Sequence, residues 1–366
     1  MNLSIGIVGL PNVGKSTLFN ALLKKQQALA ANYPFATIEP NIGVVAVLDE
    51  RLQKLAEITK VEEKMVSLPP IKPATVEFVD IAGLVKGASE GAGLGNKFLS
   101  HIREVFVIAH VVRVFEDENV VKEGAVDPKS DYETIRTELQ IADLQTLQNL
   151  NEKALRTDPI KRQTVEKLKE ALDNGKNAFE ITLTEEESLS IRQLSLLTSK
   201  KEIIVLNVAE DKYNPEGIAD ITQKYSDLLN INNEKIVVIC AKIESELALL
   251  SEEEQKEYLK EMGLQQSGLE RLIQKAYQEL GLISFLTAGV KEVRAWTIKK
   301  GFNALLASGE IHTDFMKKFI KAEVVSYKDF VENNGWRGSK EKGKTKLEGK
   351  EYIMQDGDIV EFKIGT

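Results

Sequence analysis

Short apolar runs alternate with a helical pattern along the first 125 residues of the chain. Leu3–Val8, Ile42–Leu48, Thr75–Val79 and Val105–Phe115 have the composition of buried strands, and Lys15–Lys24 has the spacing of a helix. Strands that alternate with helices are typical of an α/β domain. We therefore expect a mostly parallel sheet in this part of the chain.

A different period begins near Asp131. Apolar residues now recur three or four positions apart, at Ile135, Leu139 and Ala142 and again at Val165, Leu168 and Leu172. This spacing predicts a helical hairpin or a short coiled coil that ends near Asp173-Asn174-Gly175. Strand-like runs return at Glu202–Leu206 and Lys235–Ile239, so the helical segment is predicted to be an insertion into the α/β domain.

A third pattern begins near Leu282. Val290–Thr297, Glu323–Tyr327 and Ile359–Ile364 are predicted strands around one helix near Asp314–Ile320. We therefore expect three domains: an α/β domain made of residues 1–130 and 199–281, an inserted helical domain of residues 131–198, and a small α+β domain of residues 282–366.

Composition narrows the class of protein. Of 366 residues, 43% are apolar and 28% are charged, which are values typical of globular proteins. No apolar run approaches the roughly 18 residues that a membrane span needs, and no signal peptide precedes Leu3–Val8, so we expect a cytoplasmic protein. The single cysteine, Cys240, excludes an internal disulfide and a site built from several thiolates.

Charge is distributed unevenly along the chain. The net charge is −8, whereas residues 282–366 hold 15 Lys and Arg against 12 Asp and Glu. The chain as a whole is therefore not expected to attract nucleic acid, but its C-terminal module is mildly basic.

The motif with the clearest chemistry is Gly9-Leu10-Pro11-Asn12-Val13-Gly14-Lys15-Ser16, which follows the first strand and opens the first helix. This is the setting of a phosphate-binding P-loop, in which backbone N–H groups and the helix N-terminus face phosphate oxygens. Lys15 would reach the β- and γ-phosphates and the Ser16 hydroxyl would hold Mg²⁺. The alternative is a glycine-rich turn. Nucleotide-binding candidates from the loop are Asn12, Val13, Gly14, Lys15, Ser16 and Thr17.

Two further residues extend this site. Asp80 ends the predicted strand before Ile81-Ala82-Gly83, where it can orient Mg²⁺ through water, and Gly83 can offer its N–H to the γ-phosphate. An aspartate at this place could instead cap a helix. Thr37 lies in a polar loop bounded by prolines and is a further candidate Mg²⁺ ligand, one that would bind only while the γ-phosphate is present.

These motifs resemble the YchF (Obg-like ATPase) family of Obg-related P-loop NTPases. The similar segments are Asn32–Asn41, Asp80–Ala88 and Ile311–Phe315, and the resemblance extends over essentially the whole chain. It implies a G domain with a helical insertion and a C-terminal TGS domain of ubiquitin-like β-grasp fold. These three parts match the three patterns described above.

Base recognition departs from the pattern of GTPases. Those enzymes read guanine with Asn-Lys-x-Asp, whereas this chain has Asn207-Val208-Ala209-Glu210. The longer Glu210 displaces the carboxylate that would pair with guanine, while an amide such as Asn207 suits adenine. The resemblance implies the same preference for ATP. Asn207 could instead cap a turn. Cys240, Ala241 and Lys242 resemble the last base-binding loop, with Cys240 a small buried residue.

Hydrolysis is expected to be slow. The position after Gly83 holds Leu84, where many GTPases have a glutamine that orients water. His101, Arg103 and His110 are candidate substitutes, and the resemblance favours His110, although a buried core histidine is the alternative reading. Asn12 matches a position that binds K⁺ in some related NTPases, so K⁺ is a second candidate cofactor beside Mg²⁺.

The C-terminal module offers a candidate RNA contact. Lys340, Lys342, Lys344 and Lys346 alternate with other residues, so an extended chain would place them on one face, close to Trp336 and Arg337. The alternative is a solvated lysine-rich loop. TGS domains generally accompany proteins of translation, which favours RNA or the ribosome.

Together these features predict a monomeric, switch-type ATPase that binds ATP·Mg²⁺, hydrolyses it slowly and contacts the large ribosomal subunit. Two alternatives remain open. One is a true GTPase switch, and the other is a ribosome-binding protein for which the nucleotide is a structural ligand.

Overall fold

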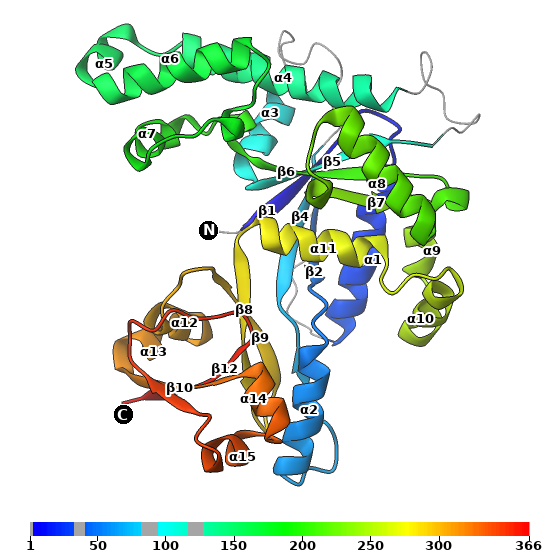
Figure 1. The fold of residues 1–366 in the computed structure, drawn as a ribbon, viewed down its shortest axis with the longest axis vertical. Coiled ribbons are helices and arrows are strands. Elements are labelled where there is room, and N and C mark those ends of the chain that lie inside the picture. Colours follow the sequence, from blue (N-terminus) through cyan, green and yellow to red (C-terminus); the bar gives the residue numbers. More distant parts are fainter. Residues whose placement is uncertain (1–2, 33–40, 82–93, 116–126, 366) are drawn as a thin grey trace. The chain divides into compact units, whose positions relative to one another are not determined.

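The computed structural model describes residues 3–32, 41–81, 94–115 and 127–365 (Figure 1). Thr37 and Gly83 lie outside these residues. The chain divides into two compact units. One comprises Met1–Val45 and Glu77–Leu272, and the other comprises Ala46–Val76 and Ile273–Thr366. The predicted three-domain division has other boundaries, because it keeps residues 46–76 and 273–281 in the α/β domain, and it stays a prediction.

The first unit is built on a six-stranded sheet with the strand order β2-β4-β1-β5-β6-β7. From β4 through β7 neighbouring strands pair in parallel, which confirms the predicted sheet. Strands β1, β5 and β7 are buried at every position, as expected when helices cover both faces of a parallel sheet. The strands are β1 Ser4–Val8, β2 Ile42–Ala46, β4 Thr75–Asp80, β5 Val107–Arg113, β6 Lys201–Asn207 and β7 Ile236–Ile239.

The predicted helical hairpin is present in this unit. Helix α4 packs against α6, and α6 ends at Asp173, where the sequence predicts the stop. Asp127 caps α4 by accepting from the backbone N–H groups of Lys129 and Ser130. The helices of the unit are α1 Lys15–Asn32, α3 Leu94–Glu104, α4 Pro128–Gln148, α5 Glu152–Thr157, α6 Pro159–Asp173, α7 Glu185–Ile191, α8 Pro215–Leu229, α9 Ala241–Leu247, α10 Glu252–Glu261 and α11 Gly268–Glu279. From Ile273 onward, α11 belongs to the second unit. Short 3₁₀ turns are η1 Ala178–Glu180, η2 Arg192–Leu194, η3 Leu197–Ser199, η4 Glu210–Lys212 and η5 Asn233–Lys235.

The second unit has a mixed sheet with the order β11-β10-β12-β8-β9-β3. Its core gathers Phe285, Ile298, Phe319, Val324 and Phe362. The strands are β3 Ile71–Lys72, β8 Leu282–Ala288, β9 Val293–Lys299, β10 Phe319–Ser326, β11 Lys346–Glu348 and β12 Asp358–Ile364, and the helices are α2 Arg51–Glu62, α12 Ala304–Ile311, α13 Thr313–Lys318, α14 Tyr327–Glu332 and α15 Trp336–Glu341. The assignment of this unit as a TGS domain stays a prediction.

Two details of the C-terminal prediction were wrong. The expected strand Val290–Thr297 runs across a turn, in which Gly289 N donates to Glu292 O at 3.2 Å and which separates β8 from β9. Several short helices replace the single expected one. They are too short for a helical period to stand out from the strand runs beside them.

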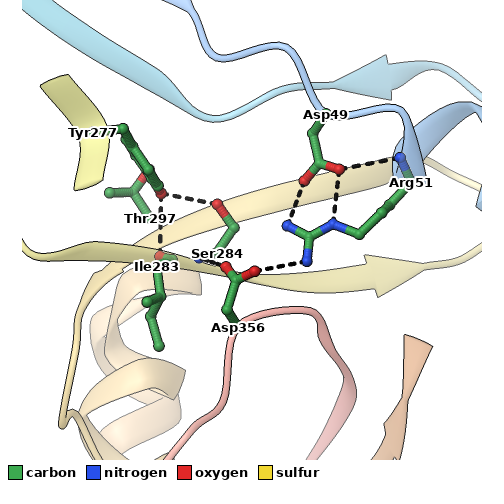
Figure 2. A network of polar contacts seen from close by, with 7 residues as sticks. All are labelled: Asp49, Arg51, Tyr277, Ile283, Ser284, Thr297 and Asp356. Atoms are coloured by element: carbon green, nitrogen blue, oxygen red, sulfur yellow. Dashed lines mark hydrogen bonds and ion pairs between the residues drawn. The ribbon is translucent and has the colours of Figure 1, made fainter. Parts of the chain in front are cut away.

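Residues 46–76 join the second unit although they lie early in the sequence. Strand β3 pairs in parallel with β9, with Ile71 opposite Val293. At the start of α2, the Arg51 guanidinium makes two hydrogen bonds of 2.8 Å to Asp49 and a third of 2.8 Å to Asp356 (Figure 2). Asp356 also accepts from Ser284 N at 2.9 Å, and these carboxylates raise the pKa of Arg51. At the end of α2, Glu62 accepts from the N–H groups of Trp336 and Arg337. Both ends of α2 are thereby fastened within the unit.

Replacing Arg51 with Ala is expected to lower the free energy of unfolding of the second unit by about 2–3 kcal/mol, because charged hydrogen bonds are lost and Asp356 keeps only part of its contacts. Arg51→Lys keeps the positive charge but cannot make the paired hydrogen bonds of a guanidinium. Its free energy of unfolding should therefore lie between those of the wild type and of Arg51→Ala. Both tryptophans, Trp296 and Trp336, belong to this unit, so urea unfolding followed by their fluorescence reports on it.

Lys54→Ala is the matched control for Arg51→Ala. Lys54 lies in the same helix, and its exposed ammonium is 3.8 Å from Glu57. Exposed pairs of this kind contribute little to stability, so the unfolding midpoint should hardly move. Equal midpoints for Arg51→Ala and Lys54→Ala would contradict the role given to Arg51.

Candidate nucleotide-binding site

The phosphate loop has the setting that the sequence predicts. It leaves β1 at Val8 and ends where α1 begins at Lys15. Asn12 and Gly14 have positive φ values of 62° and 97°, which turn the backbone within four residues. A side chain at Gly9 would place its Cβ 2.6 Å from the Val111 carbonyl oxygen of β5. The loop therefore lies directly against the sheet and leads into the N-terminus of α1, where a helix favours an anion.

Lys15 and Asp80 form the charged centre of this edge. Lys15 is 8% exposed, and its ammonium donates to the carbonyl oxygen of Leu10 at 2.7 Å. Burial lowers the pKa of Lys15, and the charge of Asp80 offsets part of that effect. Burial likewise raises the pKa of Asp80, which Lys15 partly restores. Each of the two charges therefore stabilises the other in a site that is partly shielded from water. An anionic ligand would add a further partner for the Lys15 ammonium.

The oxygen donors at this edge fit Mg²⁺. Ser16 is exposed at the first turn of α1, and Asp80 is the last residue of β4. Mg²⁺ favours one or two protein oxygens together with phosphate oxygens and water. A site of this kind needs no cluster of ligands, and the described residues contain no group of three or more His, Cys, Asp or Glu that could hold a metal.

Asn207, the last residue of β6, connects the phosphate loop to the segment after β7. Its Nδ2 donates to the Val13 carbonyl oxygen at 2.9 Å, and its Oδ1 accepts from Ala241 N at 3.0 Å. Asn207 is 3% exposed. Both ends of the amide are engaged by backbone groups, so Asn207 holds the two loops together. Its amide keeps a second N–H donor and a second acceptor site, and the reading of the base by Asn207 stays a prediction.

The residues that follow β6 and β7 differ in exposure. Val208 is 3% exposed and packs in a core cluster with Cys240, so it cannot lie over a base. Cys240 is buried, as expected, and this burial raises the pKa of its thiol, which disfavours the reactive thiolate. Glu210 and Lys242 are exposed and form an ion pair with each other. The side chains left to face a ligand at this edge are therefore charged.

His110 does not face the phosphate loop with a free side chain. It is 1% exposed in β5, its Nδ1 is 2.8 Å from Glu202 Oε1, and its ring stacks on Tyr132 at 5.1 Å. Tyr132 also donates to Glu202. The catalytic assignment of His110 loses its support, because a buried ring with these partners fits the alternative reading of a core histidine.

The lysine-rich segment is not extended. Trp336–Glu341 forms α15. Gly335 precedes the helix with a φ of 110°, and Glu62 caps its first turn. Lys340 therefore lies on a helix and Lys346 on β11, and the prediction of one common face was wrong.

The partners of this segment also differ from the expectation. Lys340 pairs with Glu323 and Lys344 with Asp329, each at 3.1 Å. Trp336 packs edge-on against Phe330 and donates to Ala288 O, so it is not an exposed stacking platform. Lys342 and Lys346 are exposed.

Comparisons with known proteins agree with this geometry. A family model described as 50S ribosome-binding GTPase matches residues 4–160, and the C-terminal model of the YchF GTPases, described as a protein of unknown function (DUF933), matches residues 282–365. The chain is 48% identical to the ribosome-binding ATPase YchF of Bacillus subtilis and 47% identical to that of Haemophilus influenzae, over all of both chains in each case. The chain belongs to the YchF family. A solved YchF structure, titled the YchF GTPase of Schizosaccharomyces pombe, superimposes with a TM-score of 0.85 at 36% identity and covers 99% of this chain and 98% of its own.

Sequence reasoning missed two buried polar residues of this YchF chain, Tyr213 and Glu244. They follow the two candidate base-contacting segments by a few residues, and they hydrogen-bond to each other at 2.8 Å. A tyrosine just after a short 3₁₀ turn and a glutamate within a helix carry no motif. Only the spacing after each sheet strand could have pointed to them.

Replacing His110 with Ala should destabilise the protein and leave hydrolysis per folded molecule unchanged, because its buried ring stacks on the core residue Tyr132 and pairs with the half-buried Glu202. Loss of a general acid–base group would instead lower the rate by roughly 10²–10⁴-fold. Single-turnover hydrolysis and thermal unfolding, measured on the same sample, separate the two outcomes. A rate loss of that size in a well-folded variant would restore His110 as a catalytic residue.

Proposed function

We propose that this protein is an ATP-hydrolysing, nucleotide-dependent switch that binds the ribosome at its large subunit. The observation that carries the proposal is the phosphate loop with Lys15 and Asp80 at the carboxyl edge of a parallel sheet. Relatives of 46–48% identity over the whole chain are named ribosome-binding ATPases, which supports both parts.

The residues divide the chemistry between them. N–H groups of Asn12 to Thr17 would hold the β- and γ-phosphates, and Lys15 would neutralise the charge that develops during cleavage. Mg²⁺ would supply charge stabilisation at the phosphates, held by Ser16 and Thr37 and oriented by Asp80 through water. Gly83 would donate its N–H to the γ-phosphate. With Leu84 in place of a glutamine, hydrolysis is slow until a partner or K⁺ completes the site.

ATP is favoured over GTP by the residues at the base. Glu210 replaces the aspartate that pairs with guanine, and its carboxylate is engaged by Lys242. A carboxylate already paired with an ammonium is a weaker acceptor for the two N–H donors of guanine. The segments of residues 207–210 and 240–242 would surround adenine.

The path of the chain supports a switch. Residues 46–76 are built into the second unit, yet they connect two segments of the first. Strand β2 precedes them, soon after Thr37, and β4 follows them and ends at Asp80. Hydrogen bonds from Asp80 N to Asn41 O at 3.0 Å and from Val47 N to Ala74 O at 2.8 Å join the two strands. A change at Thr37 or Asp80 on loss of the γ-phosphate would therefore act directly on a segment of the second unit.

The remaining assignments complete the proposal. The α/β domain of residues 1–130 and 199–281 would bind nucleotide, the helical domain of residues 131–198 would contact the partner, and residues 282–366 would form a TGS domain that meets RNA. The protein would act as a cytoplasmic monomer. No helix among the described residues has the length and apolar character that crossing a membrane requires.

The proposal is tested by single-turnover hydrolysis of ATP with and without ribosomes, together with co-sedimentation in ATP, in ADP and without nucleotide. We expect slow hydrolysis that ribosomes accelerate, and binding that depends on the nucleotide. Lys15→Ala is the control, because it removes the ammonium at the phosphates. Ribosome binding that ignores the nucleotide, together with unstimulated hydrolysis, would favour the structural-ligand alternative.

The lysines of the C-terminal unit should contribute unequally to ribosome binding. Replacing Lys342 and Lys346 with Gln is expected to weaken co-sedimentation. The slope of the logarithm of the binding constant against the logarithm of the salt concentration should fall in magnitude by roughly one unit for each lysine that contacts a phosphate. The matched pair is Lys340→Gln with Lys344→Gln, because carboxylates already offset these two charges. Equal effects of the two pairs, or none, would count against an RNA contact here.

K⁺ is a proposed second cofactor, held beside Asn12. If it serves the phosphates, replacing potassium with sodium at constant ionic strength should slow single-turnover hydrolysis, and Asn12→Ala should remove the difference. Equal rates in the two salts would dismiss the idea.

A further inference from the structure

A buried polar cluster lies beyond the two candidate base-contacting segments of the first unit. Glu244, which is 1% exposed, accepts hydrogen bonds through Oε1 from Tyr213 Oη at 2.8 Å and from Gly268 N at 2.7 Å. Tyr213 is fully buried. Arg271 Nη2 lies 3.3 Å from the Tyr213 hydroxyl and donates to Val238 O in β7 at 2.8 Å.

Tyr213 and Glu244 lie just after the two candidate base-contacting segments in the chain. Tyr213 directly follows η4, whose first residue is Glu210. Glu244 lies two residues after Lys242, in the first turns of α9. One hydrogen bond therefore ties the segment after β6 to the segment after β7.

The cluster leaves little freedom for either segment. A Cβ at Gly268 would lie 2.7 Å from Tyr213 Oη and 3.0 Å from Glu244 Oε1, so only glycine lets the first turn of α11 approach this closely. Asn207 and Ala241 are joined by a hydrogen bond of 3.0 Å on the side of the phosphate loop. The two segments are thus held at two points, one beside the phosphate loop and one behind the base-facing residues.

We propose that Tyr213 and Glu244 are positioning residues that set the separation of residues 207–210 from residues 240–242 and thereby the selectivity for the nucleotide base. The inference rests on the proposed nucleotide site. Hydrogen-bond recognition is lost when partners move by about half an ångström, so the spacing of the two segments decides which base both can contact.

Two substitutions separate positioning from packing. Tyr213→Phe keeps the ring in its hydrophobic cluster and removes only the hydroxyl. Glu244→Gln keeps an oxygen acceptor for both Tyr213 and Gly268. Burial raises the pKa of Glu244, so an uncharged amide should be tolerated at this place.

The experiment measures equilibrium binding of ATP, GTP and inorganic tripolyphosphate to the full-length protein and to both variants. For Tyr213→Phe we expect ATP affinity to fall about three- to tenfold, the size of one lost hydrogen bond, and the ATP-to-GTP ratio to fall with it. Tripolyphosphate binding should not change, because the phosphate loop keeps its tie to Asn207. Glu244→Gln should bind all three ligands like the wild type.

Two outcomes would overturn the inference. One is a Tyr213→Phe variant with wild-type nucleotide selectivity. The other is an equal loss of tripolyphosphate and ATP, which would mean general damage to the fold. Failure of the wild type to bind either nucleotide is a different result, because it would contradict the proposed function itself.

Discussion

The amide of Asn207 connects three parts of the chain that are distant in sequence, and the candidate site depends on it. It lies at the end of β6, its nitrogen reaches the Val13 carbonyl in the phosphate loop, and its oxygen reaches the backbone of Ala241. A side chain at Gly14 would collide with this amide. The contact with Asn207 therefore requires glycine at a position whose φ is also positive. The phosphate and base halves of the site are thus assembled around one buried side chain, whose loss would leave two buried backbone groups unpaired.

The parallel sheet explains why these groups meet. Val8, Asp80, Asn207 and Ile239 are the last residues of β1, β4, β6 and β7, so their following segments emerge at one edge. In the proposed site, the loop after β1 would contact the phosphates, the end of β4 would add a carboxylate, and the segments after β6 and β7 would face the base. Residues 46–76 connect β2 with β4 of this sheet, and they belong to the other compact unit.

Local patterns were enough to predict much of this fold. The buried strands of the first unit, the phosphate loop before α1 and the helical hairpin ending at Asp173 all follow from periodicity and from residues close in sequence. The place of residues 46–76 could not be predicted, because it depends on the pairing of β3 with β9 more than 200 residues later. The shape of the lysine-rich segment failed for the same reason, since α15 is capped by Glu62 from a distant helix. The role of Asn207 was missed because its partners are backbone groups, which no residue type reveals.

The proposed preference for ATP rests on Glu210, whose carboxylate is paired with Lys242. The most direct measurement is the equilibrium affinity of the wild-type protein for ATP and for GTP, determined side by side with Mg²⁺ in one buffer. The account predicts that ATP binds more tightly. A GTP affinity tenfold higher than that for ATP, about 1.4 kcal/mol in favour of GTP, would contradict it.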